Sequence, residues 1–173
     1  LVSRPSLIIC DEPTTSLDVT IEAQILDLLL ELREKLGTSI IMITHDLGVI
    51  ARLCDRVIVM YGGKIVERGT VDEIFYETAH PYTKGLMNSI AKLDTEKGQK
   101  LTPIEGTPPD LFAPPAGCPF AARCEYAMEV CYQYPAEVYQ MSEEHETSCW
   151  LQNELAPDTD MRKANAVKKG EVE

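Results

Sequence analysis

The stretch Leu7-Ile8-Ile9-Cys10-Asp11-Glu12-Pro13-Thr14-Thr15-Ser16-Leu17-Asp18 decides the fold that we expect for this chain. Its apolar run from Leu7 to Cys10 is typical of a strand that is buried on both faces of a parallel sheet. The run ends in two adjacent carboxylates, Asp11 and Glu12. Open α/β sheets bind ligands beyond the carboxyl ends of their strands, so the sequence predicts that both acids lie where chemistry takes place. An Asp at this position is typical of Mg²⁺ binding in P-loop nucleotidases, and the second acid could then deprotonate water. The alternative is an acidic loop that only caps the next helix.

The composition is that of an ordinary soluble protein of 173 residues, 45% hydrophobic and 25% charged. A formal net charge of −12 argues against non-specific binding to nucleic acid or to anionic lipid, because both require basic surfaces. No stretch approaches the ~20 apolar residues that a membrane span needs, and there is no secretory leader. We therefore expect an intracellular protein that reaches a membrane only through a partner.

The residues that follow the acids predict a βαβ unit. Asp18 is a good N-cap for a helix from about Val19 to Leu36, and Gly37 supplies the C-terminal stop. Residues 39–43 form a second apolar strand that is rich in β-branched side chains. A strand, a helix and a strand in this order predict parallel neighbouring strands and an α/β fold.

A hairpin is predicted after this unit. Residues 56–61 and 64–68 read as strands on either side of Gly62-Gly63, a two-residue turn signal. Gly69 breaks the strand pattern, and residues 70–73 form a capping box that opens the next helix. We interpret this part of the chain as framework.

The string DEPTTSLD, residues 11–18, closely resembles the Walker B segment and D-loop of the ABC-transporter ATPase family. The resemblance implies that Asp11 is the carboxylate associated with Mg-ATP and that Glu12 is the catalytic base. It also implies that Ser16 and Asp18 belong to a D-loop, which in this family runs along the interface between two ATPase subunits.

A second resemblance concerns His45, which follows the second strand. A lone histidine at a strand end is more often structural than catalytic. However, the segment ITHDLGVIARLCDRVIVMYGGKIVERGT, residues 43–70, resembles the H-loop of ABC ATPases and the region after it. By this resemblance His45 is the switch histidine that contacts the γ-phosphate of ATP and orients Glu12 and the water.

After Tyr76 the pattern narrows to one subfamily. His80-Pro81-Tyr82 precedes a short amphipathic helix and resembles the HPY segment of oligopeptide/dipeptide-type ABC importer ATPases. On the residues alone it is a loop with an aromatic anchor. Six of the eleven prolines fall between Pro103 and Pro119, which predicts an extended, semi-rigid linker.

Four cysteines follow with the spacing C-x5-C-x6-C-x17-C: Cys118, Cys124, Cys131 and Cys149. Two disulfides are a poor interpretation for a protein in a reducing compartment. Structural zinc sites usually show paired C-x2–4-C knuckles, which are missing here. Irregularly spaced thiolates suit an iron–sulfur cubane, so a cluster, zinc and free thiols all stay open. His145 is a possible zinc ligand.

The stretches GCPFAARCEYAMEVC, residues 117–131, and HETSCW, residues 145–150, resemble the terminal cysteine motif of the oligopeptide/dipeptide importer ATPases. Some members of that family carry a [4Fe-4S] cluster there, and the resemblance implies that the four cysteines bind one. We expect this cluster to act as a structural staple for a small extension that lacks a hydrophobic core of its own.

The expected fold class is α/β: the C-terminal part of a P-loop ABC ATPase domain, with parallel strands, helices and a β-hairpin, followed by a small irregular Cys-rich extension. We expect residues 1–76 to belong to the nucleotide-binding domain and 77–110 to form the HPY helix and the Pro-rich linker. Residues 111–152 would form the Cys-rich extension, and 153–173 a charged, disordered tail.

The resemblance implies the ATP-binding subunit of an ABC importer for oligopeptides, dipeptides or nickel complexes, at the cytoplasmic side of the membrane. Its expected partners are a second ATPase subunit, two permease subunits and a substrate-binding protein, and nucleic acid is not among them. The chain contains neither a G-x-x-x-x-G-K-[ST] phosphate loop nor an LSGGQ-type signature, so we expect a C-terminal piece that is inactive alone. The alternatives are a non-transport ABC ATPase with a zinc module and a non-catalytic cluster-binding fragment.

Overall fold

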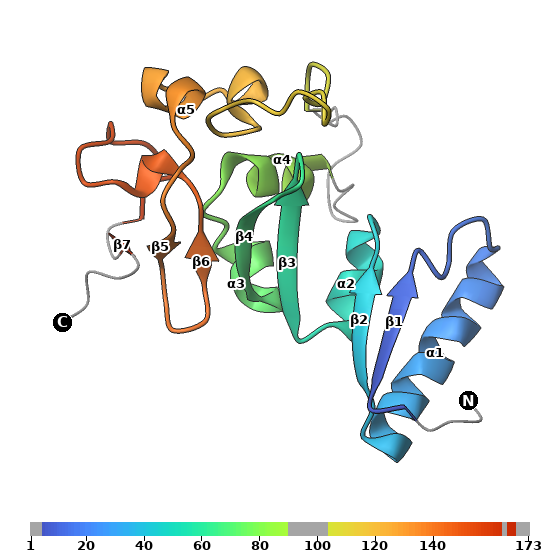
Figure 1. Cartoon of the computed structure of the whole chain (residues 1–173). Helices are drawn as coiled ribbons and strands as arrows, with labels where there is room; N and C mark the ends of the chain where they lie inside the picture. The colour runs from blue at the N-terminus through green and yellow to red at the C-terminus, as the bar shows by residue number, and fades with distance from the viewer. Residues whose placement is uncertain (1–4, 90–103, 164–165, 169–173) are drawn as a thin grey trace, which may run out of the picture. The chain divides into compact units, whose positions relative to one another are not determined.

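The computed structural model describes residues 5–89, 104–163 and 166–168, and the chain divides into two compact units between Asp55 and Arg56. Each unit has its own sheet (Figure 1). The division differs from the boundary that we expected after residue 76, because the hairpin that begins at Arg56 pairs with strands from the C-terminal part of the chain. Most of the expected Pro-rich linker, residues 90–103, lies outside the described residues.

In the first unit, β1 (Leu7–Asp11) and β2 (Ser39–Ile43) are parallel neighbours joined by α1 (Val19–Leu36), and α2 (Leu47–Leu53) follows β2. The cap residues set the bounds of α1. The side chain of Asp18 accepts hydrogen bonds from the N–H groups of Thr20 and Ile21, each at 3.0 Å, and Gly37 ends the helix in the left-handed region with φ of +63°. The predicted βαβ unit is confirmed.

The two helices of this unit pack on one face of its sheet. The core contains Leu26, Leu29, Val49 and Leu53 from the helices, with Cys10, Ile40 and Met42 from the strands against them. The alternate strand residues Leu7, Ile9, Ile41 and Ile43 are exposed. The expectation that β1 is buried on both faces is therefore wrong for the described part of the chain, because helices cover only one side of this sheet.

The second unit is built on an antiparallel sheet with the strand order β3-β4-β6-β5-β7. Its strands are β3 (Arg56–Tyr61), β4 (Lys64–Thr70), β5 (Tyr139–Gln140), β6 (Glu146–Thr147) and β7 (Val167–Lys168). The predicted hairpin is confirmed, with Gly62 and Gly63 at its turn at φ of +54° and +76°. Gly69 does not break β4 as expected, because it pairs with Val57 inside the strand.

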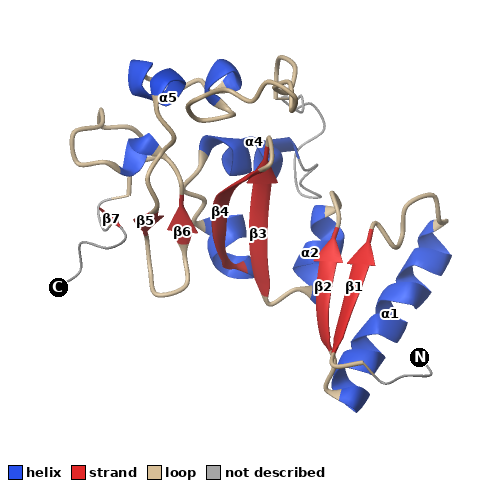
Figure 2. Ribbon diagram, in the orientation of Figure 1, coloured by secondary structure: helices blue, strands red, loops and turns tan. Residues whose placement is uncertain are grey.

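Short helices and loops make up the rest of this unit, as Figure 2 shows. The helices are α3 (Val71–Tyr76), α4 (Pro81–Ser89), α5 (Glu129–Gln133) and two 3-10 turns, Ala121–Arg123 and Trp150–Gln152. The predicted capping box is present, since Thr70 and Glu73 each bond the other's backbone. None of the described helices combines the length and apolar character that crossing a membrane requires.

The segment after Gln152 differs from the disordered tail that we expected. Met161 is 2% exposed and forms a core with Cys149 and Leu151, and β7 pairs with β5. The amide of Gln152 binds the carbonyl oxygens of Ala79 and Met161 at 2.9 and 2.8 Å. These contacts hold the segment although its composition is charged, and residues 169–173 lie outside the described residues.

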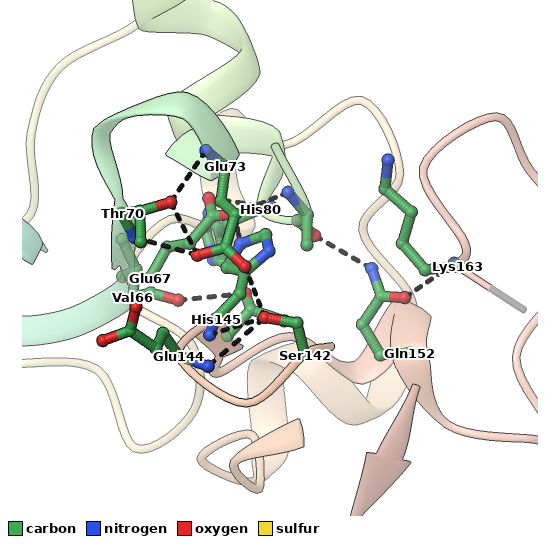
Figure 3. A network of polar contacts seen from close by, with 12 residues as sticks. Val66, Glu67, Thr70, Glu73, His80, Ser142, Glu144, His145, Gln152 and Lys163 are labelled. Carbon is green, nitrogen blue, oxygen red and sulfur yellow. Dashed lines mark hydrogen bonds and ion pairs between the residues drawn. The ribbon is translucent and has the colours of Figure 1, made fainter. Parts of the chain in front are cut away.

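A buried carboxylate on β4 connects three segments of the second unit. Figure 3 shows Glu67 beside His80 and His145. One carboxylate oxygen of Glu67 accepts the N–H of Ala79 at 2.6 Å and lies 2.8 Å from Nε2 of His145, and the other accepts the N–H of His80 at 3.1 Å. The side chains of Glu67 and His145 are 0% and 3% exposed. Buried polar groups must find partners, so these contacts fix how β4, the Ala79–His80 loop and the turn before β6 meet.

We predict that Glu67→Ala lowers the free energy of unfolding by about 3–5 kcal/mol, because it leaves buried partners without an acceptor. Urea unfolding followed by circular dichroism measures this. The matched control is Glu144→Gln, which removes an exposed ion pair with Arg56 at 3.1 Å and should cost under about 1 kcal/mol. Equal effects from the two variants would contradict the role of Glu67.

Candidate functional site

The first candidate site lies where β1 and β2 end side by side. Asp11 is the last residue of β1 and is in register with Ile43, the last residue of β2. The N–H of Glu12 donates to the carbonyl oxygen of Ile43 at 2.9 Å, so the backbone of the acid is tied to the neighbouring strand. Thr44 is the first residue after β2, and His45 is the second. Parallel pairing therefore brings Glu12 and His45 to one edge of the sheet.

The side chains of Glu12 and His45 meet there. Nδ1 of His45 lies 2.8 Å from Oε1 of Glu12, and the hydroxyl of Thr15 donates to Oε2 of Glu12 at 2.7 Å. Glu12 is 39% exposed and His45 is 81% exposed, so solvent and a ligand can reach both. A carboxylate and an imidazole in contact can exchange or orient a proton. The contact is compatible with the expectation that His45 orients Glu12.

The loop between β1 and α1 is strained in two places. Glu12 has φ of +47° and Ser16 has φ of +68°, and both are non-glycine residues in the left-handed region. Such residues cost free energy and cluster at functional sites. The side chain of Asp18 caps α1, as the sequence predicted, while Ser16 is exposed.

The second candidate site is a cavity in the second unit. It is lined by all four predicted cysteines, together with His80, Pro81, Phe120, Ala121, Tyr126, Ala136, Trp150 and Leu151. None of these thiols is in a disulfide. The N–H of Cys118 donates to the carbonyl oxygen of Cys131 at 2.7 Å, which joins two of the predicted ligands through the backbone. The chain thus gathers thiols that are far apart in the sequence.

The candidate metal ligands of the described residues do not form a site for a single metal ion, however. Within residues 5–89, 104–163 and 166–168, no three His, Cys, Asp or Glu side chains are placed so that they could hold a metal ion. His145 is engaged by Glu67 and does not line the cavity, so its role as a zinc ligand has no support. His80 does line it, and Nδ1 of its ring accepts the N–H of Tyr82 at 3.1 Å.

Comparison with known proteins separates the possible families. Residues 66–131 match the family described as oligopeptide/dipeptide transporter, C-terminal region. The chain is 56% identical over 157 residues to the dipeptide transport ATP-binding protein DppD of Bacillus subtilis, covering 90% of this chain and 46% of that protein. It is 53% identical over 135 residues to the oligopeptide transport ATP-binding protein OppD of Salmonella typhimurium, covering 78% and 40%. The chain belongs to the ATP-binding proteins of oligopeptide and dipeptide ABC transporters.

The chain spans under half the length of these two curated relatives. Among solved structures, cbiO1 of Clostridium perfringens, part of the ABC transporter complex cbiONQ, matches with a TM-score of 0.39 and 40% identity. That match covers 42% of this chain and 29% of cbiO1.

Sequence reasoning placed Glu12 and His45 together and grouped the four cysteines, and the structure brings both sets together. It missed Thr15, whose hydroxyl contacts Glu12, and the position of His80 beside the thiols. Spacing carries a signal for Thr15, because it closes a turn that begins at Glu12. For His80 the only signal was the HPY resemblance.

The environment shifts the titration of several site residues. Hydrogen bonds from His45 and Thr15 lower the pKa of Glu12, and the hydrogen bond to Glu12 raises the pKa of His45. Burial raises the pKa of the Cys118 and Cys149 thiols and raises that of Cys124 to about 11. A bare cysteine cavity therefore favours neutral thiols, and deprotonation needs a compensating positive charge.

We predict that His45 of the ligand-free chain titrates above its ordinary value of about 6.5 and that Glu12→Gln returns it towards that value. The pKa of His45 is higher in the folded chain than in the unfolded chain. The stability that protonated His45 contributes is therefore complete below its pKa in the unfolded chain, and it is lost as pH rises through its pKa in the folded chain. The pKa of Glu12 is lower in the folded chain than in the unfolded chain. The stability that ionised Glu12 contributes is therefore lost as pH falls through its pKa in the folded chain. Imidazole proton shifts measured by NMR give the midpoint.

Glu22→Gln is the matched control for this titration, because Glu22 is a half-buried acid in the first turn of α1 that takes no part in the contact between Glu12 and His45. It should leave the midpoint of His45 unchanged. A midpoint that does not respond to Glu12→Gln would show that the contact is absent in solution.

Proposed function

We propose that this chain is the C-terminal part of an ATP-hydrolysing subunit of a peptide ABC importer. The observation that carries the proposal is the 2.8 Å contact between Glu12 and His45 at the carboxyl ends of two parallel strands. Membership of a family of transport ATP-binding proteins supplies the nucleotide as the ligand. The relatives are named as transport proteins, which favours this over a non-transport ATPase with a zinc module.

The residues present suit hydrolysis of bound Mg-ATP. Asp11 ends β1 beside Ile43 with its side chain exposed, where it would hold Mg²⁺. The metal would neutralise charge on the phosphate oxygens. Glu12 would accept a proton from the attacking water, and His45 would contact the γ-phosphate and thereby sense it. Pairing with His45 before nucleotide arrives keeps the carboxylate oriented.

The rest of the machinery is proposed from the family. Ser16 and Asp18 would lie at the interface with a second ATPase subunit. Two membrane-spanning permeases and a substrate-binding protein would complete an importer for oligopeptides or dipeptides, with this subunit peripheral at the cytoplasmic side. The exposed apolar face of the β1–β2 sheet supports a larger ATPase domain, because such a face is normally covered. The isolated chain, which lacks a G-x-x-x-x-G-K-[ST] sequence, should not turn over ATP.

We predict that Glu12→Gln in the complete ATP-binding subunit lowers ATP turnover by about 10²–10⁴-fold and leaves ATP binding unchanged, because only proton transfer is removed. Phosphate release and nucleotide binding, measured separately, test this. Glu22→Gln on α1 is the control and should behave as the unmodified subunit. Undiminished turnover in Glu12→Gln would overturn the assignment of the base.

For the cysteine cavity we propose a [4Fe-4S] cluster with a structural role. Four free thiols line one cavity, yet no three donors in the described residues are placed for a single ion. A four-iron cubane is wider than one ion, so its ligands lie farther apart, and irregular spacing suits it. Its positive irons would offset the burial that disfavours thiolates. Zinc is the alternative.

We predict about four iron and four acid-labile sulfide per chain after anaerobic purification, with both lost in Cys124→Ser. Iron and sulfide analysis with a visible absorption spectrum measures this. Cys54→Ser is the control, because Cys54 packs against the core of the first unit and does not line the cysteine cavity. Stoichiometric zinc without iron would favour the alternative, and absence of metal would leave four thiols with no ligand.

A further inference from the structure

We propose that Thr15 is a positioning residue for ATP hydrolysis: it holds Oε2 of Glu12 and thereby selects Oε1 as the atom that takes the proton of water. The inference rests on the proposed function of Glu12 as the base. It goes beyond that proposal by assigning separate tasks to the two oxygens of one carboxylate. It also gives a chemical task to a residue of the loop that leads to the subunit interface.

The contacts divide the carboxylate of Glu12 between two partners. The hydroxyl of Thr15 donates to Oε2 at 2.7 Å, and Nδ1 of His45 lies 2.8 Å from Oε1. A hydroxyl has one proton to donate, and Thr15 uses it on Oε2. The two contacts therefore do not compete for the same oxygen.

The backbone fixes the position of the Thr15 donor. The N–H of Thr15 donates to the carbonyl oxygen of Glu12 at 3.2 Å, and the N–H of Glu12 donates to Ile43 at 2.9 Å. Glu12 has φ of +47°, and the intervening Pro13 restricts the turn further. Thr is β-branched and has few side-chain rotamers. Donor and acceptor thus belong to one turn that is anchored on β2.

The partner of Oε1 is the ring of His45, which does not belong to this turn. His45 lies on the segment after β2 and is 81% exposed, so its ring can leave Glu12 for another acceptor. When it does, Oε1 loses its contact with the ring while Thr15 still holds Oε2. The terminal torsion of a glutamate is soft, so without Thr15 the carboxylate plane would rotate.

Oε1 of Glu12 takes one proton from water as the water oxygen bonds to the γ-phosphorus of ATP. The bond from that phosphorus to the β–γ bridging oxygen breaks, and ADP leaves with the electron pair. The carboxylic acid then returns its proton to solvent or phosphate. Throughout the step, Thr15 donates to Oε2 and so favours the orientation in which Oε1 faces the water.

The test uses two substitutions of one hydroxyl in the complete ATP-binding subunit. Thr15→Val has nearly the same shape but no donor, and Thr15→Ser keeps the donor. We expect Thr15→Val to lower kcat about tenfold with KM for Mg-ATP unchanged, and Thr15→Ser to restore most of it. Thr20→Val in the first turn of α1 is the control and should leave kcat unchanged. A merely structural role would change unfolding rather than split kcat from KM.

The double variant Thr15→Val with Glu12→Gln separates this inference from the proposed function. If Thr15 acts through Glu12, the double variant is no slower than Glu12→Gln alone. If Thr15→Val keeps full kcat while Glu12→Gln loses it, or if Ser and Val behave alike, the inference about Thr15 is wrong and the base stands. If Glu12→Gln itself keeps full turnover, the proposed function falls, and the role of Thr15 with it.

Discussion

The parallel pairing of β1 with β2 is the constraint on which the first candidate site depends. Asp11 and Ile43 end the two strands in register, and one backbone hydrogen bond from Glu12 to Ile43 continues the pairing past the last strand residue. Because of this bond, the position of Glu12 is set by β2, the strand that also delivers His45. A change of register would move the acid to the opposite face of the sheet. The site therefore follows from strand pairing and does not need a large enclosed pocket.

The sequence predicted the elements whose signals are local. Three such features depend only on the residues that form them, and the structure confirms all three: the N-cap Asp18, the helix end at Gly37 and the Gly62-Gly63 turn. Expectations that depended on distant segments were less successful. Gly69 continues β4 because β3 pairs with it, and the charged segment around Met161 is ordered by burial against the Cys-rich part. Neither partner can be read from the local sequence.

The candidate sites show the same division. The positions of Asp11, Glu12 and His45 at the ends of β1 and β2 could be predicted from strand periodicity, and the chemistry that we propose for them comes from the resemblance. The contact of the Thr15 hydroxyl was harder to predict: its spacing from Glu12 is compatible with a turn, but the contact also needs a left-handed backbone at Glu12, which the residue types there do not indicate. For the cysteines, spacing predicted a shared site but not the burial of His80 beside it, where desolvation lowers the pKa of the ring to about 3.

The described part of the chain contains two Glu–His contacts of the same length, 2.8 Å, and their surroundings give them different roles. Glu67 and His145 are buried, so neither can exchange its partner for water, and separating them would strand polar groups in an apolar core. Glu12 and His45 are exposed, so water can replace either partner at small cost. A permanent contact between two segments of the chain needs a buried pair such as Glu67 and His145. A base that must release its histidine when a nucleotide arrives needs an exposed pair such as Glu12 and His45. It also needs a local hydrogen-bond donor, such as Thr15, that stays on the base when the histidine leaves.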